Sequence, residues 1–164
     1  MEQEGNGMSA QKLPWDIKQQ ILWIVRGYER TRREYNRQRA EILNIGGGDH
    51  FTEYIDDRGR KCRAALPGSK NASRTAENIA LKLAGLENSQ SFRQMRAVEH
   101  ARAKIGAGMP EGLADALRDA IMLNCMNGRK YPFERLFLSG ISRSDFYRIR
   151  DVFFREIAEE VGLI

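Results

Sequence analysis

The chain has 164 residues, which fits one domain or one domain with an extended helical arm. Its 41% hydrophobic residues suffice for a core, whereas 30% charged residues, a mean hydropathy of −0.57 and the lack of a long apolar run exclude a membrane-spanning class. The net charge of +5, from 27 basic and 22 acidic residues, permits a nucleic-acid partner without requiring one.

Residues 1–12 are polar and contain glycine, so we expect a disordered tail there. Pro14 suits a first helical turn, and nothing stronger than Gly27 interrupts the following residues, which predicts a long N-terminal helix within residues 13–45. Apolar and aromatic residues recur along this helix with heptad-like spacing, at Ile17, Ile21, Ile24, Tyr28, Tyr35 and Ile42.

Arginines are spread along the same helix among glutamates, at Arg26, Arg30, Arg32, Arg33, Arg37 and Arg39. One interpretation is a dimerisation or partner-docking helix, and we expect its heptad face to self-associate. A second is a basic arm along a phosphate backbone. The third is a solvated helix with ion pairs four residues apart, such as Arg30–Glu34 and Arg37–Glu41.

Residues 46–72 form the least helical part of the chain and read as a Gly-rich linker. Gly46-Gly47-Gly48 ends the helix, and no GK[ST] follows it, so it does not predict a phosphate-binding loop. Residues 51–55 and 61–66 flank the turn Asp56-Asp57-Arg58-Gly59, which can close a small β-hairpin. Residues 67–72 are rich in turn formers and predict a linker.

Residues 73–164 are expected to form a helical domain that ends in a helix-turn-helix at 132–161. Before that motif, periodicity predicts helices from Ser73 or Thr75 to Leu86, over 92–105 with a break at 88–91, and over 111–126. The predicted fold class is mostly α, with a long N-terminal helix, a helical middle with a small or absent β-hairpin, and the C-terminal motif.

The C-terminal motif reads as a short helix near Phe133, a tight turn at Ser139-Gly140-Ile141, and a longer helix. Ser142 suits the N-cap of that longer helix, with Asp145 three residues on as a variant of the capping box. Ile141 and Phe146 have the spacing of a hydrophobic staple.

One face of the last helix is apolar at helical spacing, at Phe146, Ile149, Phe153 and Ile157. The outward candidates for DNA contact are Arg143, Ser144, Tyr147 and Arg148, which we call the reading face. Arg150 lies nearer the apolar side, which predicts a partly buried pairing residue or a phosphate contact. From spacing considerations, an ordinary amphipathic helix with solvated arginines is an equal alternative. Arg129, Lys130 and Arg135, the basic lead-in, offer backbone contacts just before the helix.

The stretch GISRSDFYRIRDVFFREIAEEVGLI resembles the C-terminal helix-turn-helix of phage and prophage late-gene regulators. That helix-turn-helix is similar to region 4 of sigma-70 factors. These are the RinA-like and ArpU-like activators of Gram-positive phages. The resemblance covers roughly Leu13 to Ile164, and its specific part is GISRSDFYRIRDVFF. It implies a sequence-specific regulator of late transcription that binds double-stranded DNA in the cytoplasm of a bacterial host. Activation would add a contact with RNA polymerase.

The sequence predicts no enzyme and no cofactor. His50 and His100 neighbour no nucleophile motif, and Asp56-Asp57 fits a solvated turn better than a metal site. Cys62 and Cys125 lie far apart, outside any CxxC or Cys/His cluster, so we expect neither a metal nor a disulfide framework. The N-terminus shows no charged-then-apolar leader, which favours a cytoplasmic protein.

Two alternatives belong to other functional classes. A small terminase subunit also joins a helix-turn-helix to an oligomerising helix, but it forms rings and binds packaging sites. A helical protein-binding adaptor would instead present the arginine-bearing face to an acidic partner. A homo-oligomer is compatible with all three readings, and a membrane partner with none of them.

Overall fold

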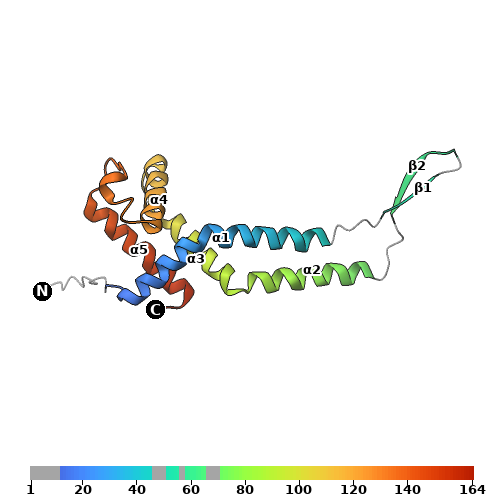
Figure 1. Ribbon diagram of the computed structural model, residues 1–164, viewed down its shortest axis with the longest axis horizontal. Coiled ribbons are helices and arrows are strands. Elements are labelled where there is room, and N and C mark those ends of the chain that lie inside the picture. Colours follow the sequence, from blue (N-terminus) through green and yellow to red (C-terminus); the bar gives the residue numbers. More distant parts are fainter. Residues whose placement is uncertain (1–11, 46–50, 56–57, 66–70) are drawn as a thin grey trace, which may run out of the picture. The chain divides into compact units, whose positions relative to one another are not determined.

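The computed structural model describes residues 12–45, 51–55, 58–65 and 71–164, and most of them are helical (Figure 1). This confirms the predicted mostly α class. Within these ranges, no helix combines the length and apolar character that a membrane crossing requires. The helices in chain order are α1 Trp15–Ile45, α2 Asn71–Glu87, α3 Gln90–Lys104, α4 Glu111–Met126, the short 3-10 helix η1 Phe133–Arg135, and α5 Arg143–Val161.

Two short strands lie between α1 and α2 in the sequence. β1 Phe51–Ile55 and β2 Lys61–Ala65 pair antiparallel, with Phe51 opposite Ala65 and Ile55 opposite Lys61. The hairpin turn through Asp56 and Asp57 stays a prediction, because these two residues lie outside the described ranges. The predicted tail up to residue 11, the glycines at 46–48 and linker residues 66–70 lie outside them as well.

Local capping sets the start of α3 earlier than predicted. The backbone N–H of Phe92 donates to Ser89 Oγ at 3.3 Å, and that of Arg93 donates to the Ser89 carbonyl at 3.1 Å. The first bond satisfies one of the donors that a helix start leaves unpaired, and the second is the first backbone bond of the helix itself. The break expected over 88–91 is therefore only a short turn before Gln90.

The chain divides into two compact units. Unit 1 comprises Met1–Gly27 and Arg96–Ile164, and unit 2 comprises Tyr28–Met95. Unit 1 contains the first part of α1, most of α3, and all of α4 and α5. Its core is built from fully or almost fully buried apolar side chains on these helices: Ile21, Val25, Val98, Leu117, Ile121, Phe146, Phe153, Phe154 and Ile157.

The first part of the heptad face of α1, at Ile21 and Ile24, lies in this core, which corrects the expectation that these residues mediate self-association. Ile21 is 0% exposed and Ile24 is 9% exposed within a single chain, so neither can form an interface with a second copy while unit 1 is folded. The spacing identified a buried stripe correctly, but α1 buries it against the chain's own helices. Polar contacts support the same packing, since Lys18 Nζ lies 3.4 Å from Asp151 Oδ1 on α5.

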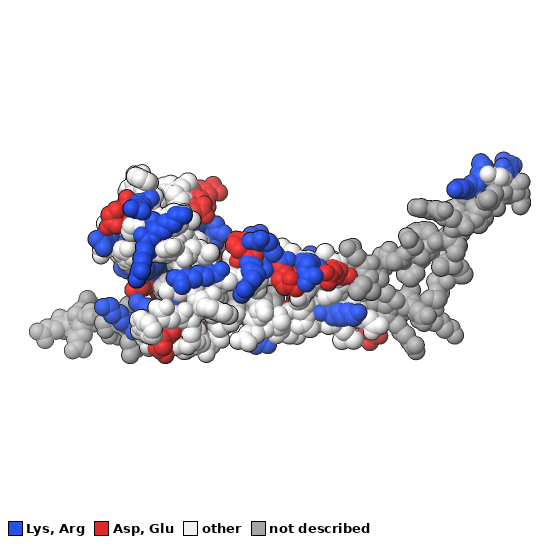
Figure 2. Space-filling model, in the orientation of Figure 1, with Lys and Arg blue, Asp and Glu red and all other residues white. Residues whose placement is uncertain are grey.

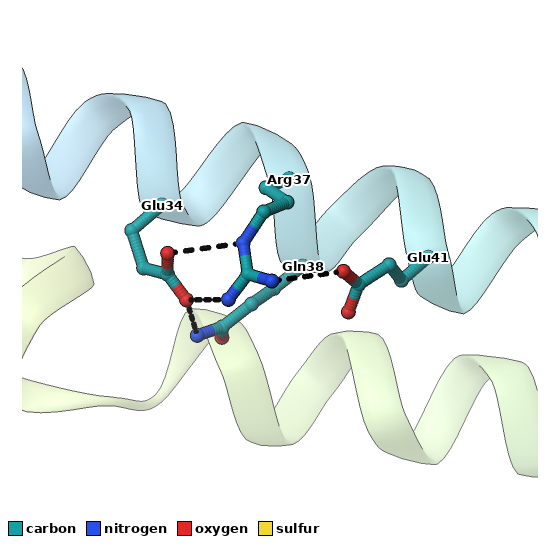
Figure 3. Close-up of polar contacts among 4 residues, drawn as sticks. All are labelled: Glu34, Arg37, Gln38 and Glu41. Atoms are coloured by element: carbon teal, nitrogen blue, oxygen red, sulfur yellow. Dashed lines mark hydrogen bonds and ion pairs between the residues drawn. The ribbon is translucent and has the colours of Figure 1, made fainter.

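In unit 2 the second half of α1 packs beside the α2–α3 junction. The Tyr35 and Phe92 rings stack with centroids 4.8 Å apart. Along α1, Arg37 bonds to Glu34 at 2.7 Å and to Glu41 at 3.2 Å, and Glu34 also accepts from Gln38 (Figure 3). The predicted Arg37–Glu41 pair is therefore present.

The other predicted pair on this helix, Arg30–Glu34, is absent. Among the described residues Arg30 has no carboxylate partner, because Glu34 faces Arg37 and Gln38 instead.

Candidate nucleic-acid interface

A capped helix start positions the reading face. Gly140 adopts a left-handed φ of +85°, which lets the chain turn tightly before α5. The Asp145 N–H then donates to Ser142 Oγ at 3.1 Å, and the Ser142 hydroxyl donates to Asp145 Oδ2 at 2.7 Å. Ser142 is thus the N-cap, as predicted, and it fixes where the helix begins.

Burial of the apolar face of α5 determines that its opposite face, which carries the reading face, points to solvent. Of the four predicted apolar positions, Phe146, Phe153 and Ile157 are buried, whereas Ile149 is only half-buried. Phe146 is 0% exposed, and its ring lies 5.5 Å from that of Phe133. Phe154 is buried too, which the single-face interpretation did not include. Because one side is held in the core, the first turns of α5 direct the reading face to solvent.

Two arginines of the reading face project from this helix start. Arg148 is 75% exposed and its Nη2 lies 2.9 Å from Asp145 Oδ1, while Arg143 is 68% exposed and its Nη1 lies 3.1 Å from Glu134 Oε1. Ser144 is exposed and Tyr147 is half-buried. Exposed ion pairs of this kind typically contribute only about 0–1 kcal/mol. Both guanidinium groups can therefore exchange their carboxylates for another anion at little cost.

The Ser142 hydroxyl, and after it Arg148, hold the pKa of the Asp145 carboxyl below its usual value of 3.8. A folded-state pKa below the unfolded value means that the stabilisation is present above about pH 4 and is lost as the pH falls through the lower, folded pKa. We expect thermal unfolding of the Asp145→Asn variant to depend less on pH than that of the parent chain between pH 6 and pH 2.5. Equal pH profiles of the two proteins would contradict this role.

A buried polar bridge holds the basic lead-in to the helices. Asn124 on α4 is 4% exposed; its Nδ2 donates to the Tyr131 carbonyl at 2.9 Å, and its Oδ1 accepts from Arg150 Nη1 at 2.9 Å. The Arg150 guanidinium also lies 4.7 Å from the Tyr147 ring centroid and 5.4 Å from that of Phe154. Arg150 is therefore a partly buried pairing residue, one of its two predicted roles.

Loss of the bridge should loosen the segment between α4 and α5. Asn124→Ala would leave the Tyr131 carbonyl and a partly buried guanidinium without this partner, and we expect the free energy of unfolding to fall by about 1–3 kcal/mol. The control is Asn127→Ala, which removes one exposed bond to the Lys130 N–H and should change stability by less than about 0.5 kcal/mol. Chemical denaturation of both variants measures the difference. Similar stabilities would mean that the bridge does not hold the segment.

Contacts connect the basic lead-in to the reading face. Lys130 is exposed with its ammonium 5.3 Å from the Tyr131 ring centroid, and its carbonyl accepts from Arg135 Nη1 at 3.5 Å. Next to Arg135, Glu134 pairs with Arg143 at the start of α5. Arg129 is exposed on the same segment, and the described residues show no hydrogen bond or ion pair between it and the other site residues. Figure 2 shows Lys and Arg side chains gathered over α5 and the segment before it.

The first half of the predicted motif contains one unexpected feature. The predicted short helix near Phe133 is the three-residue 3-10 helix η1, and the chain leaves helical geometry soon after it. Phe137 has φ +49°, the sole positive φ among the described non-glycine residues, and its side chain is 90% exposed. A left-handed conformation typically costs a non-glycine residue about 1–2 kcal/mol. Sequence reasoning missed this residue, since no local pattern signals an exposed, strained phenylalanine.

A concave site lies in unit 2, apart from the predicted residues. It is a cleft of about 620 Å³ lined by Arg30, Arg33, Tyr35 and Phe92, together with Ser89 and other residues of α1, α2 and α3. Arg30 and Arg33 have no carboxylate partner among the described residues, which keeps open the interpretation of α1 as a basic arm. On the face that Figure 2 shows, however, Lys and Arg are interspersed with Asp and Glu along α1, so this face of the helix is not uniformly basic.

The described side chains include no cluster of three or more His, Cys, Asp or Glu residues placed to hold a metal ion. Burial raises the pKa of the Cys125 thiol to about 12, so this cysteine is a neutral core residue at neutral pH. Comparisons with protein-family models, curated proteins and solved structures give no match to this chain.

Proposed function

We propose that the chain is a sequence-specific DNA-binding regulator of phage or prophage late transcription that reads the major groove with α5. In this proposal residues 132–161, with η1, the turn at Gly140 and α5, serve as a helix-turn-helix akin to region 4 of sigma-70 factors. The observation that carries the proposal is Arg148, which is 75% exposed early in a helix whose other side is buried in the core. The predicted hairpin within residues 46–72 has no role in it.

The side chains at the start of α5 have the chemistry that base reading needs. A guanidinium such as that of Arg148 can donate two parallel hydrogen bonds to O6 and N7 of guanine. Ser144 can donate to or accept from either a base edge or a phosphate, and Arg143 can exchange Glu134 for a phosphate. The N-terminal residues of a recognition helix are the ones that meet the bases.

The basic lead-in would position the protein on the duplex. Arg129, Lys130 and Arg135 precede α5 on a segment fixed through Asn124, so their charges would meet the phosphate backbone beside the groove. Contacts of this kind set register and orientation but do not distinguish sequences. They also make binding depend on salt, because each neutralised phosphate releases condensed counterions.

The proposal places the protein in the cytoplasm of the bacterial host, with double-stranded DNA and RNA polymerase as partners. The proposal also includes self-association of the chain as a homo-oligomer. An interface would have to use a surface other than Ile21 and Ile24, which are buried. Late-gene activation would then require that DNA-bound protein recruits the polymerase.

Selection of bound fragments from a random duplex pool tests this function. We expect a shared sequence to be enriched, and the binding constant for it to fall steeply as salt rises from 50 to 200 mM. The absence of salt-dependent binding to any duplex would reject the function and favour the protein-adaptor reading. Native mass measurement of a closed ring would favour the terminase reading.

A further inference from the structure

Phe137 combines two features that do not favour folding. Its backbone is left-handed at φ +49°, a conformation that bulky residues rarely adopt, and its side chain is 90% exposed, more than any other large hydrophobic residue described. A glycine would relieve the backbone, and a polar residue would suit the exposure. A strained residue that contributes nothing to the core indicates a role toward a partner.

The surroundings of Phe137 indicate which partner. It follows η1 and precedes the turn into α5, between Arg135 and Arg143, and Lys130 is joined to Arg135 by a hydrogen bond. Basic residues near an exposed apolar ring do not suit a purely apolar protein surface, although Glu134 also lies in this segment and pairs with Arg143. They suit a polyanion with an apolar interior, and stacked bases between two phosphate chains are such a partner.

We infer that Phe137 is a wedge that inserts between base pairs in the minor groove next to the major groove that α5 enters, an inference that rests on the proposed function. The chain from Phe137 to Ser142 spans at most about 18 Å. The turn at Gly140 makes the actual separation shorter than this limit, so Phe137 would enter the groove directly beside the one that α5 enters.

An inserted phenylalanine has a defined effect on DNA. Apolar wedges in the minor groove unstack one base step and kink the duplex toward the major groove. Here that kink would fold the duplex around α5 and bring its phosphates toward the basic lead-in. Pyrimidine–purine steps unstack most easily, so the inserted position should favour TA or CA/TG without any hydrogen bond to the bases.

The test compares Phe137→Gly and Phe137→Trp with the parent chain on the duplex recovered by selection. Phe137→Gly should raise the melting temperature, because glycine adopts φ +49° without strain. It should nevertheless lower the affinity for the duplex about tenfold or more, and fluorescence energy transfer between the duplex ends should show that the bend is lost. Phe137→Trp, which keeps an aromatic wedge, should retain both binding and bending.

Salt dependence separates a wedge from a charge contact. The slope of the binding constant against salt should be the same for Phe137→Gly and the parent chain, since the ring meets no phosphate. Arg135→Ala is the matched control, and it should reduce that slope by about one unit.

If Phe137→Gly binds and bends the duplex as the parent chain does, the inference that Phe137 inserts between base pairs is wrong, while the proposed function is unaffected. If the parent chain binds no duplex at all, both the proposed function and this inference are wrong.

Discussion

Phe146→Ala is expected to lower the free energy of unfolding by about 3–5 kcal/mol. Phe146 is 0% exposed, its ring contacts those of Phe133 and Tyr147, and it lies one turn after the Ser142 cap. Removing the ring would leave a cavity between α5 and the segment before it. The same substitution should therefore abolish any activity of the reading face, because the start of α5 would no longer be held in place.

Thermal unfolding followed by circular dichroism measures this effect. Val152→Ala is the matched control, since Val152 lies on the same helix and is 54% exposed. Its substitution should change stability by less than about 0.5 kcal/mol. If Phe146→Ala melted like Val152→Ala, the packing of α5 described above would be wrong.

Gly106→Ala is expected to destabilise unit 1 by about 2–5 kcal/mol, the sum of left-handed strain and overpacking. Gly106 has φ +75° at the bend between α3 and α4. A methyl group there would lie 2.6 Å from the Ala114 Cβ and 2.9 Å from its Cα, both on α4. Neither atom can move without shifting α4, whose buried residues include Leu117 and Ile121.

Gly108→Ala separates the two contributions to this effect. Gly108 has φ +82° in the same bend, but a methyl group on it would meet no atom within 4 Å. Its substitution should cost only the backbone strain, about 1–2 kcal/mol. Chemical denaturation of both variants gives the comparison. Equal losses would show that α4 does not approach Gly106 closely.

Local signals predicted the ends of several helices. Pro110 and Asn127-Gly128 bound the predicted helix 111–126, and α4 has the same limits. Ser142 caps α5 as its position suggested, and Gly162, at φ +79°, ends the helix. These boundaries depend on side chains within a few residues of each end, which is why sequence reasoning could find them.

Tertiary contacts could not be predicted in the same way. The spacing of Ile21 and Ile24 identified a buried stripe but not what covers it, because a stripe packs equally well on another copy or on the same chain. Asn124 fell correctly on the inner stripe of α4, yet its bonds to Tyr131 and Arg150 join three segments of the chain. No pattern along one helix reveals such a bridge.

The candidate site was predicted only as a set of exposed residues. Helical spacing placed Arg148 opposite the core, and its exposure agrees with that. The link from Arg143 to Glu134 and the strained backbone of Phe137 depend on how the segment before α5 folds back, which spacing does not specify. Whether these side chains meet DNA remains the proposal.

The most direct measurement is a titration of the parent chain and Arg148→Ala on the selected duplex and on a scrambled duplex, at two salt concentrations. Arg33→Ala is the control for loss of one positive charge away from α5. The free energy of unfolding of Arg148→Ala should lie within about 0.5 kcal/mol of the parent value, because the Arg148 side chain is exposed and its one ion pair among the described residues is with Asp145.

If Arg148 reads a base, the variant should bind the selected duplex about 1–3 kcal/mol more weakly and lose preference over the scrambled one. Arg33→Ala should keep that preference. If Arg148→Ala discriminates between the two duplexes as well as the parent chain does, α5 does not read the sequence through this residue and the central claim is wrong.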